Sequence, residues 1–350
     1  MNPVRNHEPQ PINRKTSGSI SNGMKLLIIT QVVDSEDPIL GFFHRWIEEF
    51  AKHVERVEVI CLKEGRHVLP AHVQVHSLGK ERGAVGRATY ALRFLLLAWR
   101  LRRDYNAVFV HMNPEYVMLA GPLWRLWGKH VALWYTHKSV NLKLRIAVLF
   151  AHVVFTASIE SFRLGTAKLR IMGHGIDVDF FSPDSSVQRG TTVLSVGRLS
   201  PIKRHDIVIR AAKHFPNDVH IAGDGPEMRH LENLTKHLSL VSRVHFLGSK
   251  TQEQLREEYR RAGVFVHASE TGSLDKVVLE ALACGLPVIT TSASLKNLPV
   301  TVVSATPDAI AQAVISVRDA NAQSLVTYVQ EHHSLQRLVP TILGIMRDTI

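Results

Sequence analysis

The apolar and polar positions from residue 24 onward alternate between two periods. Continuous apolar runs such as MKLLIIT are typical of buried parallel strands, and they alternate with segments whose apolar residues recur every three or four positions. The strands expected in the first half lie at 24–30, 56–62, 72–78, 107–112, 130–136 and 153–158. The helices expected between them lie at 42–54, 87–103, 115–128 and 142–150. This alternation predicts a doubly wound sheet.

A second alternating set follows a segment rich in Gly, Pro, Ser and Asp. Its strands are expected at 191–197, 218–223, 243–248, 264–269, 287–291 and 300–305, and its helices at 205–215, 226–238, 251–262 and 276–284. The segment 174–190 has the composition of a linker, and residues 1–23 lack an apolar period, which predicts a disordered tail. We therefore predict an α/β fold with two Rossmann-like doubly wound domains, 24–173 and 191–350, facing each other across a cleft.

The charge balance adds a class of partner to this picture. The 350 residues carry a formal net charge of +11, which favours anionic partners such as nucleic acid, a membrane surface or phosphorylated small molecules. No recognisable nucleic-acid-binding module accompanies the charge, and aromatic residues make up only 7% of the chain. We therefore expect no nucleic-acid partner.

Cysteine usage and hydropathy bear on the compartment. Cys61 and Cys284 are the only cysteines and neither has a neighbour at metal-ligand spacing, so we expect neither a disulfide framework nor a structural zinc. The apolar run around 95–99 is much shorter than the roughly 20 residues of a spanning helix, and the chain does not open on a secretory signal pattern. These features predict a cytoplasmic protein.

Candidate chemistry is expected in the loops that follow the strands of the second half, because open parallel sheets bind ligands beyond the carboxyl ends of their strands. In SVGRLSPIK, Gly197 allows a close backbone approach, and Arg198 and Lys203 are placed to bind one anion. A solvated basic loop is the alternative for either cation alone. The turn Asp224-Gly225-Pro226 after the next strand fits a simple strand-to-helix connection equally well.

A third loop, SETGSLDK, combines acidic residues with a helix start. A helix is expected to begin near Ser273 or Asp275, since either side chain can cap it. Lys276 then lies in the first turn, where the helix dipole disfavours a cation unless an anion binds nearby. The alternative is an ordinary ion pair between Lys276 and Glu280, four residues further on.

The motifs VGRLSPIK, IAGDGPE, FLG and DKVVLEALACGLPVI, in this order and spacing, resemble the nucleotide-sugar half of retaining GT-B glycosyltransferases of the group 1, or GT4-like, family. More loosely, HGIDVDFF resembles the family's inter-domain segment, and LGFFHRWIEEFA and WYTHKS resemble its acceptor-side loops. The resemblance implies an acceptor-side domain at 24–173, a nucleotide-sugar-binding domain at 191–350, and a last helix that returns to the first domain.

The resemblance also implies roles for the residues of the basic loop and of the acceptor side. Arg198 and Lys203 would grip the donor diphosphate, with Gly197 beside them. Gly41 matches a glycine loop under the phosphate, and His137 in WYTHKS matches a histidine near the transferred sugar.

The acidic loop departs from the family pattern. Glu280 matches the glutamate that binds the ribose hydroxyls, but Gly272 stands where the family usually has a first glutamate near the sugar. Asp275 and Lys276 replace the usual Gly-hydrophobic pair, a variant found in some members of the family. Glu270, Asp275 or neither is then the group that contacts the donor sugar.

The resemblance implies a UDP- or GDP-linked sugar as co-substrate and no other cofactor. Asp177 and Asp179 form a D-x-D pair of the kind that binds metal in another glycosyltransferase fold, since hard carboxylates bind Mg²⁺ or Mn²⁺. This pair lies in the linker, far in sequence from the phosphate loops. We therefore predict no metal site.

A basic amphipathic segment in the first half suggests a further partner. In 87–103, Leu, Phe and Trp alternate with arginines, and basic residues recur through 125–145. Such a surface can lie on anionic lipid, and the alternative is a buried helix with a solvated arginine edge. The hypothesis is a peripheral position on the inner face of the membrane.

The sequence thus predicts an enzyme that transfers a sugar, with retention, from a nucleotide sugar to a glycan or a lipid-linked acceptor. A nucleotide-sugar epimerase is one alternative, although no acid and base pair for that role is evident. A sugar-nucleotide-binding protein without turnover is the other, favoured by Gly272.

Overall fold

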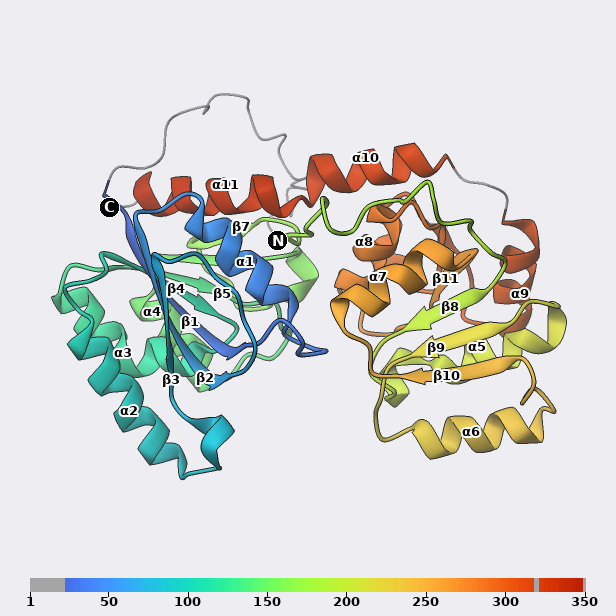
Figure 1. Ribbon diagram of the computed structural model, residues 1–350, viewed down its shortest axis with the longest axis horizontal. Coiled ribbons are helices and arrows are strands. Elements are labelled where there is room, and N and C mark those ends of the chain that lie inside the picture. The colour runs from blue at the N-terminus through green and yellow to red at the C-terminus, as the bar shows by residue number, and fades with distance from the viewer. Residues whose placement is uncertain (1–22, 318–320, 349–350) are drawn as a thin grey trace, which may run out of the picture. The chain divides into compact units, whose positions relative to one another are not determined.

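The computed structural model describes residues 23–317 and 321–348 (Figure 1). The described residues form two compact units. Unit 1 groups the described residues of Met1–Asp34, Phe43–Gly173 and Leu338–Ile350, and unit 2 groups Ser35–Phe42 with His174–Arg337. The predicted tail at 1–23 lies outside the described residues except for Gly23.

Unit 1 is built on a seven-stranded parallel sheet with the order β3-β2-β1-β4-β5-β6-β7. Its strands are β1 (Lys25–Val33), β2 (Arg56–Glu64), β3 (Val73–Ser77), β4 (Ala107–His111), β5 (His130–Trp134), β6 (Val153–Thr156) and β7 (Leu169–Ile171). The helices are α1 (Phe42–Ala51), α2 (Arg87–Arg100), α3 (Pro114–Leu126) and α4 (Leu142–Phe150), and most of α11 (Leu335–Asp348) groups with this unit. Every residue of β4 and β5 is buried, as expected for central parallel strands.

The core of unit 1 contains a chain of buried polar groups that are all paired. The Trp124 indole donates to the Tyr105 hydroxyl at 3.0 Å, and that hydroxyl donates to the Ala98 carbonyl at 2.9 Å. Burial raises the pKa of Tyr105 to about 12, so the phenol stays a neutral donor. This arrangement joins α2 to α3, and the Trp124 indole and the Tyr105 hydroxyl each find a partner in the core.

Unit 2 contains a six-stranded parallel sheet with the order β10-β9-β8-β11-β12-β13. Its strands are β8 (Val193–Val196), β9 (Val219–Ala222), β10 (Val244–Gly248), β11 (Val264–His267), β12 (Val288–Thr290) and β13 (Thr301–Val302). Its helices are α5 (His205–Ala211), α6 (Met228–His237), α7 (Gln252–Arg261), α8 (Lys276–Ala283), α9 (Pro307–Ser316) and α10 (Ala322–His332).

Two helices of unit 2, α7 and α9, begin at residues whose side chains cap them. Thr251 and Gln254 form a reciprocal capping box at the start of α7. Thr306 caps α9 by accepting from the Ala309 amide, with Pro307 in the first turn. Such caps satisfy amide groups that a helix leaves unpaired, so these starts are encoded in the nearby sequence.

The predicted fold class is confirmed: each expected strand and helix is present, and both sheets are parallel. The strand β7 and the helices α9 and α10 were not predicted. In the described ranges 23–317 and 321–348, no helix combines the length and the apolarity that crossing a bilayer requires.

Candidate functional site

In the sheet of unit 2, β8 and β11 are neighbours, and the following strands are added outward from β8 on one side and from β11 on the other. These neighbours pair in parallel through Val193 with Val264 and Leu194 with Phe265, while the chain leads from β8 to β9 on the other side. The loops that follow β8 and β11 therefore leave the same edge of the sheet on diverging paths. Ligands of open α/β sheets bind at such a switch point, and all the predicted residues of the basic and acidic loops follow these two strands.

Backbone packing shapes the first of these loops. Gly197 has φ +149°, and Gly223, after β9, has φ +148°. A Cβ atom on Gly223 would lie 2.0 Å from the Gly197 carbonyl oxygen, and one on Gly225 would lie 2.3 Å from that of Leu199. Only glycine allows this approach. The close approach of the Leu199 carbonyl therefore explains why residue 225 is a glycine, which the turn pattern in the sequence did not reveal.

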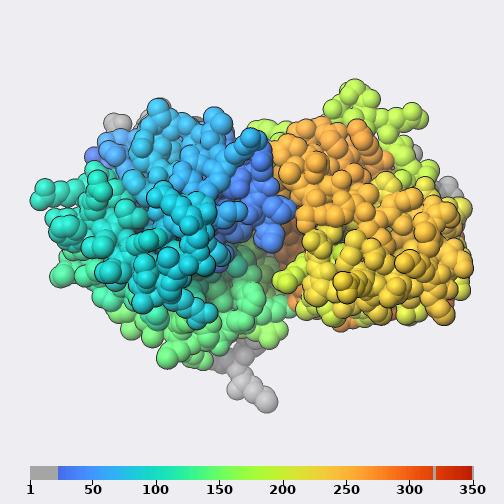
Figure 2. Space-filling view, turned by 60° about the horizontal axis from the view of Figure 1, so that its bottom comes forward, coloured from blue at the N-terminus to red at the C-terminus, as the bar shows by residue number. Residues whose placement is uncertain are grey.

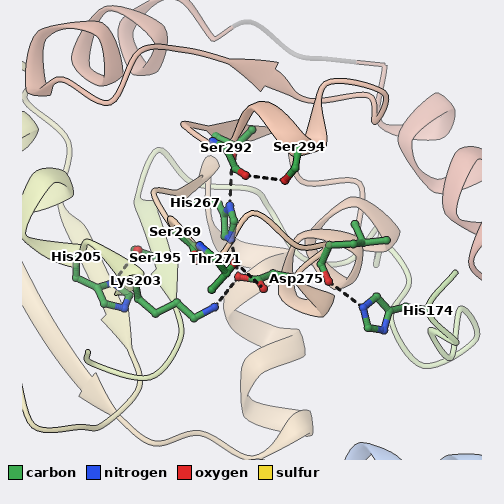
Figure 3. Close-up of polar contacts among 12 residues, drawn as sticks. His174, Ser195, Lys203, His205, His267, Ser269, Thr271, Asp275, Ser292 and Ser294 are labelled. Atoms are coloured by element: carbon green, nitrogen blue, oxygen red, sulfur yellow. Dashed lines mark hydrogen bonds and ion pairs between the residues drawn. The ribbon is translucent and has the colours of Figure 1, made fainter. Parts of the chain in front are cut away.

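The two residues predicted to bind the diphosphate differ in their exposure and in their partners. Arg198 is exposed, and over the described part of the chain its guanidinium has no hydrogen bond or ion pair. Lys203, in the single 3₁₀ turn Pro201–Lys203, is four-fifths buried, and its Nζ lies 2.5 Å from Asp275 Oδ2. Figure 3 shows this lysine extended from the β8 loop toward Asp275. The cationic pair is thus one free group and one group held by a carboxylate.

Asp275 precedes α8 but does not cap it. Its Oδ2 accepts from His267 Nε2 at 2.9 Å as well as from Lys203, and its Oδ1 accepts from the Thr271 hydroxyl at 3.3 Å. Burial alone would raise the pKa of Asp275, but the His267 hydrogen bond and the Lys203 charge outweigh burial and hold it below its usual range. The predicted capping role of Asp275 is therefore wrong, because tertiary partners take its carboxylate.

The Glu270 side chain also belongs to a loop-to-loop contact. Its carboxylate forms an ion pair with Arg204, and its amide donates to the Ile202 carbonyl at 2.9 Å. Arg204 lies in the left-handed region at φ +53°, a conformation that costs energy for a non-glycine residue. Gly272, where the family's first glutamate was expected, has φ +58°, which favours glycine over glutamate there.

Lys276 and Glu280 form the i,i+4 ion pair that was the alternative interpretation. The Lys276 ammonium lies 2.6 Å from Glu280 Oε1, and the Glu280 side chain is 1% exposed. The Tyr259 hydroxyl donates to Glu280 Oε2 at 3.1 Å. Burial and the Glu280 charge raise the pKa of Tyr259 well above its ordinary value, so the phenol remains a donor. Lys276 in the first helical turn is thus compensated without a bound anion.

Besides His267, two histidines near this edge were not singled out from the sequence. His205 is buried at the start of α5, its Nδ1 lies 3.0 Å from Ser195 Oγ, and burial lowers its pKa to about 4. His174 reaches the Leu274 carbonyl with Nε2 at 2.9 Å (Figure 3). A lone histidine in an apolar pattern carries no signal that distinguishes it from a core residue.

Gly41 and His137 lie in separate segments of the chain. Gly41 belongs to the Ser35–Phe42 segment, and its amide donates to the Asp37 carbonyl at 2.9 Å. His137 follows β5 in unit 1, is exposed, and accepts from the Ser139 amide at 3.0 Å. The roles that the resemblance implies for both residues stay predictions.

The D-x-D pair is engaged by a side-chain amide. Gln336 Nε2 donates to Asp177 Oδ1 at 3.0 Å and to Asp179 Oδ2 at 3.1 Å. In the described ranges, His, Cys, Asp and Glu side chains do not form a group of three or more that could hold a metal ion.

Comparison with solved structures identifies proteins that share this fold. The chain superposes on Anabaena Alr3699/HepE in complex with UDP and glucose with a TM-score of 0.72 and 16% identity, over 93% of this chain and 99% of that one. Sucrose-phosphate synthase from Thermosynechococcus elongatus gives a TM-score of 0.70 and 17% identity, over 92% and 98% of the two chains. At these identities the likeness concerns the fold. Two Rossmann-like units of this kind define a protein of the GT-B class.

Comparison with known sequences adds a family match for part of the chain. Residues 179–330 match the family model described as glycosyl transferases group 1. D-inositol 3-phosphate glycosyltransferase from Mycobacteroides abscessus is 34% identical over 151 residues, which make up 39% of this chain and 34% of that protein. The same enzyme from Mycobacterium leprae strain TN is 32% identical over 155 residues, 40% and 36% of the two proteins. The chain thus matches about a third of the length of these relatives.

Proposed function

We propose that this protein transfers a sugar from a UDP- or GDP-linked donor to a glycan or a lipid-linked acceptor. The observation that carries the proposal is the position of Arg198 and Lys203 on the loop that follows β8 at the switch point, within the region that matches the group 1 family model. A planar guanidinium and an ammonium are the groups that bind phosphate oxygens by charge-assisted hydrogen bonds. The complex of Alr3699/HepE with UDP and glucose supports the same ligand class.

In the proposed reaction, Arg198 and Lys203 stabilise the negative charge that develops on the departing nucleoside diphosphate. The acceptor hydroxyl attacks from the face of the leaving group, a phosphate oxygen takes its proton, and the anomeric configuration is retained. The new glycosidic bond forms as the bond between the sugar and the diphosphate breaks. We further propose that these cations, with the amide groups at the start of α8, stabilise the charge without a metal ion.

The direct test incubates the full chain with radiolabelled UDP- and GDP-sugars and with glycan and lipid extracts, alongside a thermal-shift screen of the same donors. The expected result is a higher melting temperature with one donor and acceptor-dependent transfer of its label. Conversion of the donor without any acceptor would indicate an epimerase. Stabilisation by a donor without transfer to any extract would favour a binding protein, and neither effect with any donor would contradict the proposal.

A finer proposal concerns the surface of α2, shown in cyan on the face of Figure 2. Leu92, Leu96 and Trp99 recur at helical spacing and are 59%, 57% and 55% exposed, while Phe94 and Ala98 are buried on the other side. Exposed basic residues on or beside the helix are Arg87, Arg93, Arg100 and Arg103. We propose that this apolar stripe with its arginines lies on anionic lipid, whose charge complements it.

Vesicle binding tests this surface. Replacing Leu92 and Leu96 by glutamine should lower partitioning onto anionic phosphatidylglycerol vesicles at low salt about a hundredfold, because burying each leucine contributes about 1.5 kcal/mol. Leu126 and Leu149 are 79% and 69% exposed on α3 and α4, so the same changes there serve as the control. Co-sedimentation measures binding. Equal losses in both variants, or no binding of the unaltered protein, would contradict the proposal.

A further inference from the structure

Asp275 lies at the centre of a network that joins three loops of unit 2. Lys203 comes from the loop after β8, His267 ends β11, and Thr290 ends β12. All the contacts run within unit 2, and Figure 3 shows the side chains of Lys203 and His267 pointing toward Asp275. The acidic loop was expected to contact the sugar, and the contacts indicate a different task for this carboxylate.

The direction of each hydrogen bond can be assigned along the network. Thr290 Oγ1 accepts from the Ser292 amide at 3.1 Å, so its hydroxyl proton is available for His267 Nδ1 at 3.0 Å. With Nδ1 as an acceptor, the imidazole proton is on Nε2, which donates to Asp275 Oδ2 at 2.9 Å. The buried side chains of Thr290 and His267, 0% and 3% exposed, thereby hold the carboxylate in one orientation.

Among the lysines and arginines of the described residues, Lys203 alone contacts this carboxylate. The ammonium has three donors, and one of them is directed at Asp275 Oδ2 at 2.5 Å. Two donors then remain for phosphate oxygens, on a side chain that would otherwise rotate about four carbon–carbon bonds. Fixing the ammonium before the ligand arrives lowers the entropic cost of binding.

We infer that Asp275 is a positioning residue for Lys203: held by His267 and Thr290, it orients the ammonium toward a nucleoside diphosphate without contacting the donor sugar. This inference rests on the proposed function, because it concerns how the same cation binds the same ligand. It assigns Thr290 and His267, which the sequence did not single out, to support of the diphosphate site from a distance.

The test is a double-mutant cycle on ligand affinity, with UDP and GDP as probes and isothermal titration calorimetry on the full chain. Asp275→Asn keeps the shape of the side chain and removes its charge, and it should weaken binding of the preferred diphosphate about tenfold. In a Lys203→Ala background the same change should alter affinity less than about twofold, because there is no ammonium left to orient. A purely structural role would instead give equal losses in both backgrounds.

Two further variants complete the design. Thr290→Val removes the hydroxyl at the far end of the network, and it should weaken binding about threefold and only when Lys203 is present. It serves in place of Asp275→Asn if that protein does not fold. Asp308→Asn removes one negative charge from a 78% exposed side chain in the same unit and should leave affinity unchanged.

The outcomes separate the inference from the proposed function. Tighter binding by Asp275→Asn would mean that the carboxylate only repels the ligand, and a loss that persists without Lys203 would mean that it acts elsewhere. Either result overturns the inference while diphosphate binding by the unaltered protein still supports the proposed function. If the unaltered protein binds neither UDP nor GDP, both fail.

Discussion

Replacing Arg198 and Lys203 together by alanine is expected to lower kcat/KM for sugar transfer by about 10²- to 10⁴-fold. Each charge-assisted hydrogen bond contributes about 1.5 to 3 kcal/mol, and about 1.4 kcal/mol corresponds to a factor of ten in rate. Both groups would act on the leaving diphosphate, where charge develops in the transition state. The measurement is the initial rate of label transfer over a range of donor concentrations.

The control for this variant keeps the same change in net charge. Lys213 and Lys236 are exposed on unit 2 away from the β8 loop, and replacing both by alanine should leave kcat/KM within about twofold. Because Lys203→Ala also removes the partner of Asp275, both proteins should be assayed well below their unfolding transitions. Transfer by the Arg198/Lys203 double variant at the rate of the control would place the donor diphosphate elsewhere.

Replacing Glu280 by alanine is expected to lower the free energy of unfolding by about 3 kcal/mol. The carboxylate is 1% exposed, and its loss leaves the buried Tyr259 hydroxyl without its acceptor and Lys276 without its counter-charge. Removing one partner of a buried ion pair costs about 3 to 5 kcal/mol, and the lower value applies because the Lys276 side chain is 21% exposed and can reach water. Urea unfolding followed by circular dichroism measures the change.

Two variants check the physical reason for this loss. Glu331 is exposed on α10 of the same unit, so Glu331→Ala should change stability by less than about 0.5 kcal/mol. Adding Lys276→Met to Glu280→Ala should restore part of the stability, because the Lys276 ammonium is then no longer left without its counter-charge. Equal stability of the Glu280→Ala and Glu331→Ala proteins would show that the buried pair does not support the fold.

The fold was predictable to the extent that apolar periodicity reports burial. The strands β4 and β5 are buried along their whole length and form continuous apolar runs in the sequence. The three-residue strand β7 escaped because its residues are half-buried or exposed, so the sequence contains no apolar run there. The expected strand at 300–305 is observed only as Thr301–Val302, both exposed at the sheet edge.

The candidate site was predictable as a set of residue types but not as a set of contacts. Ligands of open parallel sheets bind at the carboxyl ends of the strands, so the sequence was enough to place Arg198 and Lys203 at a binding edge. The partner of Lys203 is Asp275, 72 residues away, and nothing local to either residue specifies this pair. Asp275 had a plausible local role as a helix cap, and the ion pair with Lys203 took precedence over it.

The sequence by itself determined the two parallel sheets, the glycine-containing loops at the strand ends and the identity of the cations beside them. These features depend on side-chain period and backbone freedom, which are properties of short segments. Only the tertiary structure decided the partners of the cations in the β8 loop: Arg198 is exposed, and Lys203 is held by Asp275, 72 residues away. The reason is that electrostatic partners are chosen by distance in space, and the order of strands in the sheet sets that distance.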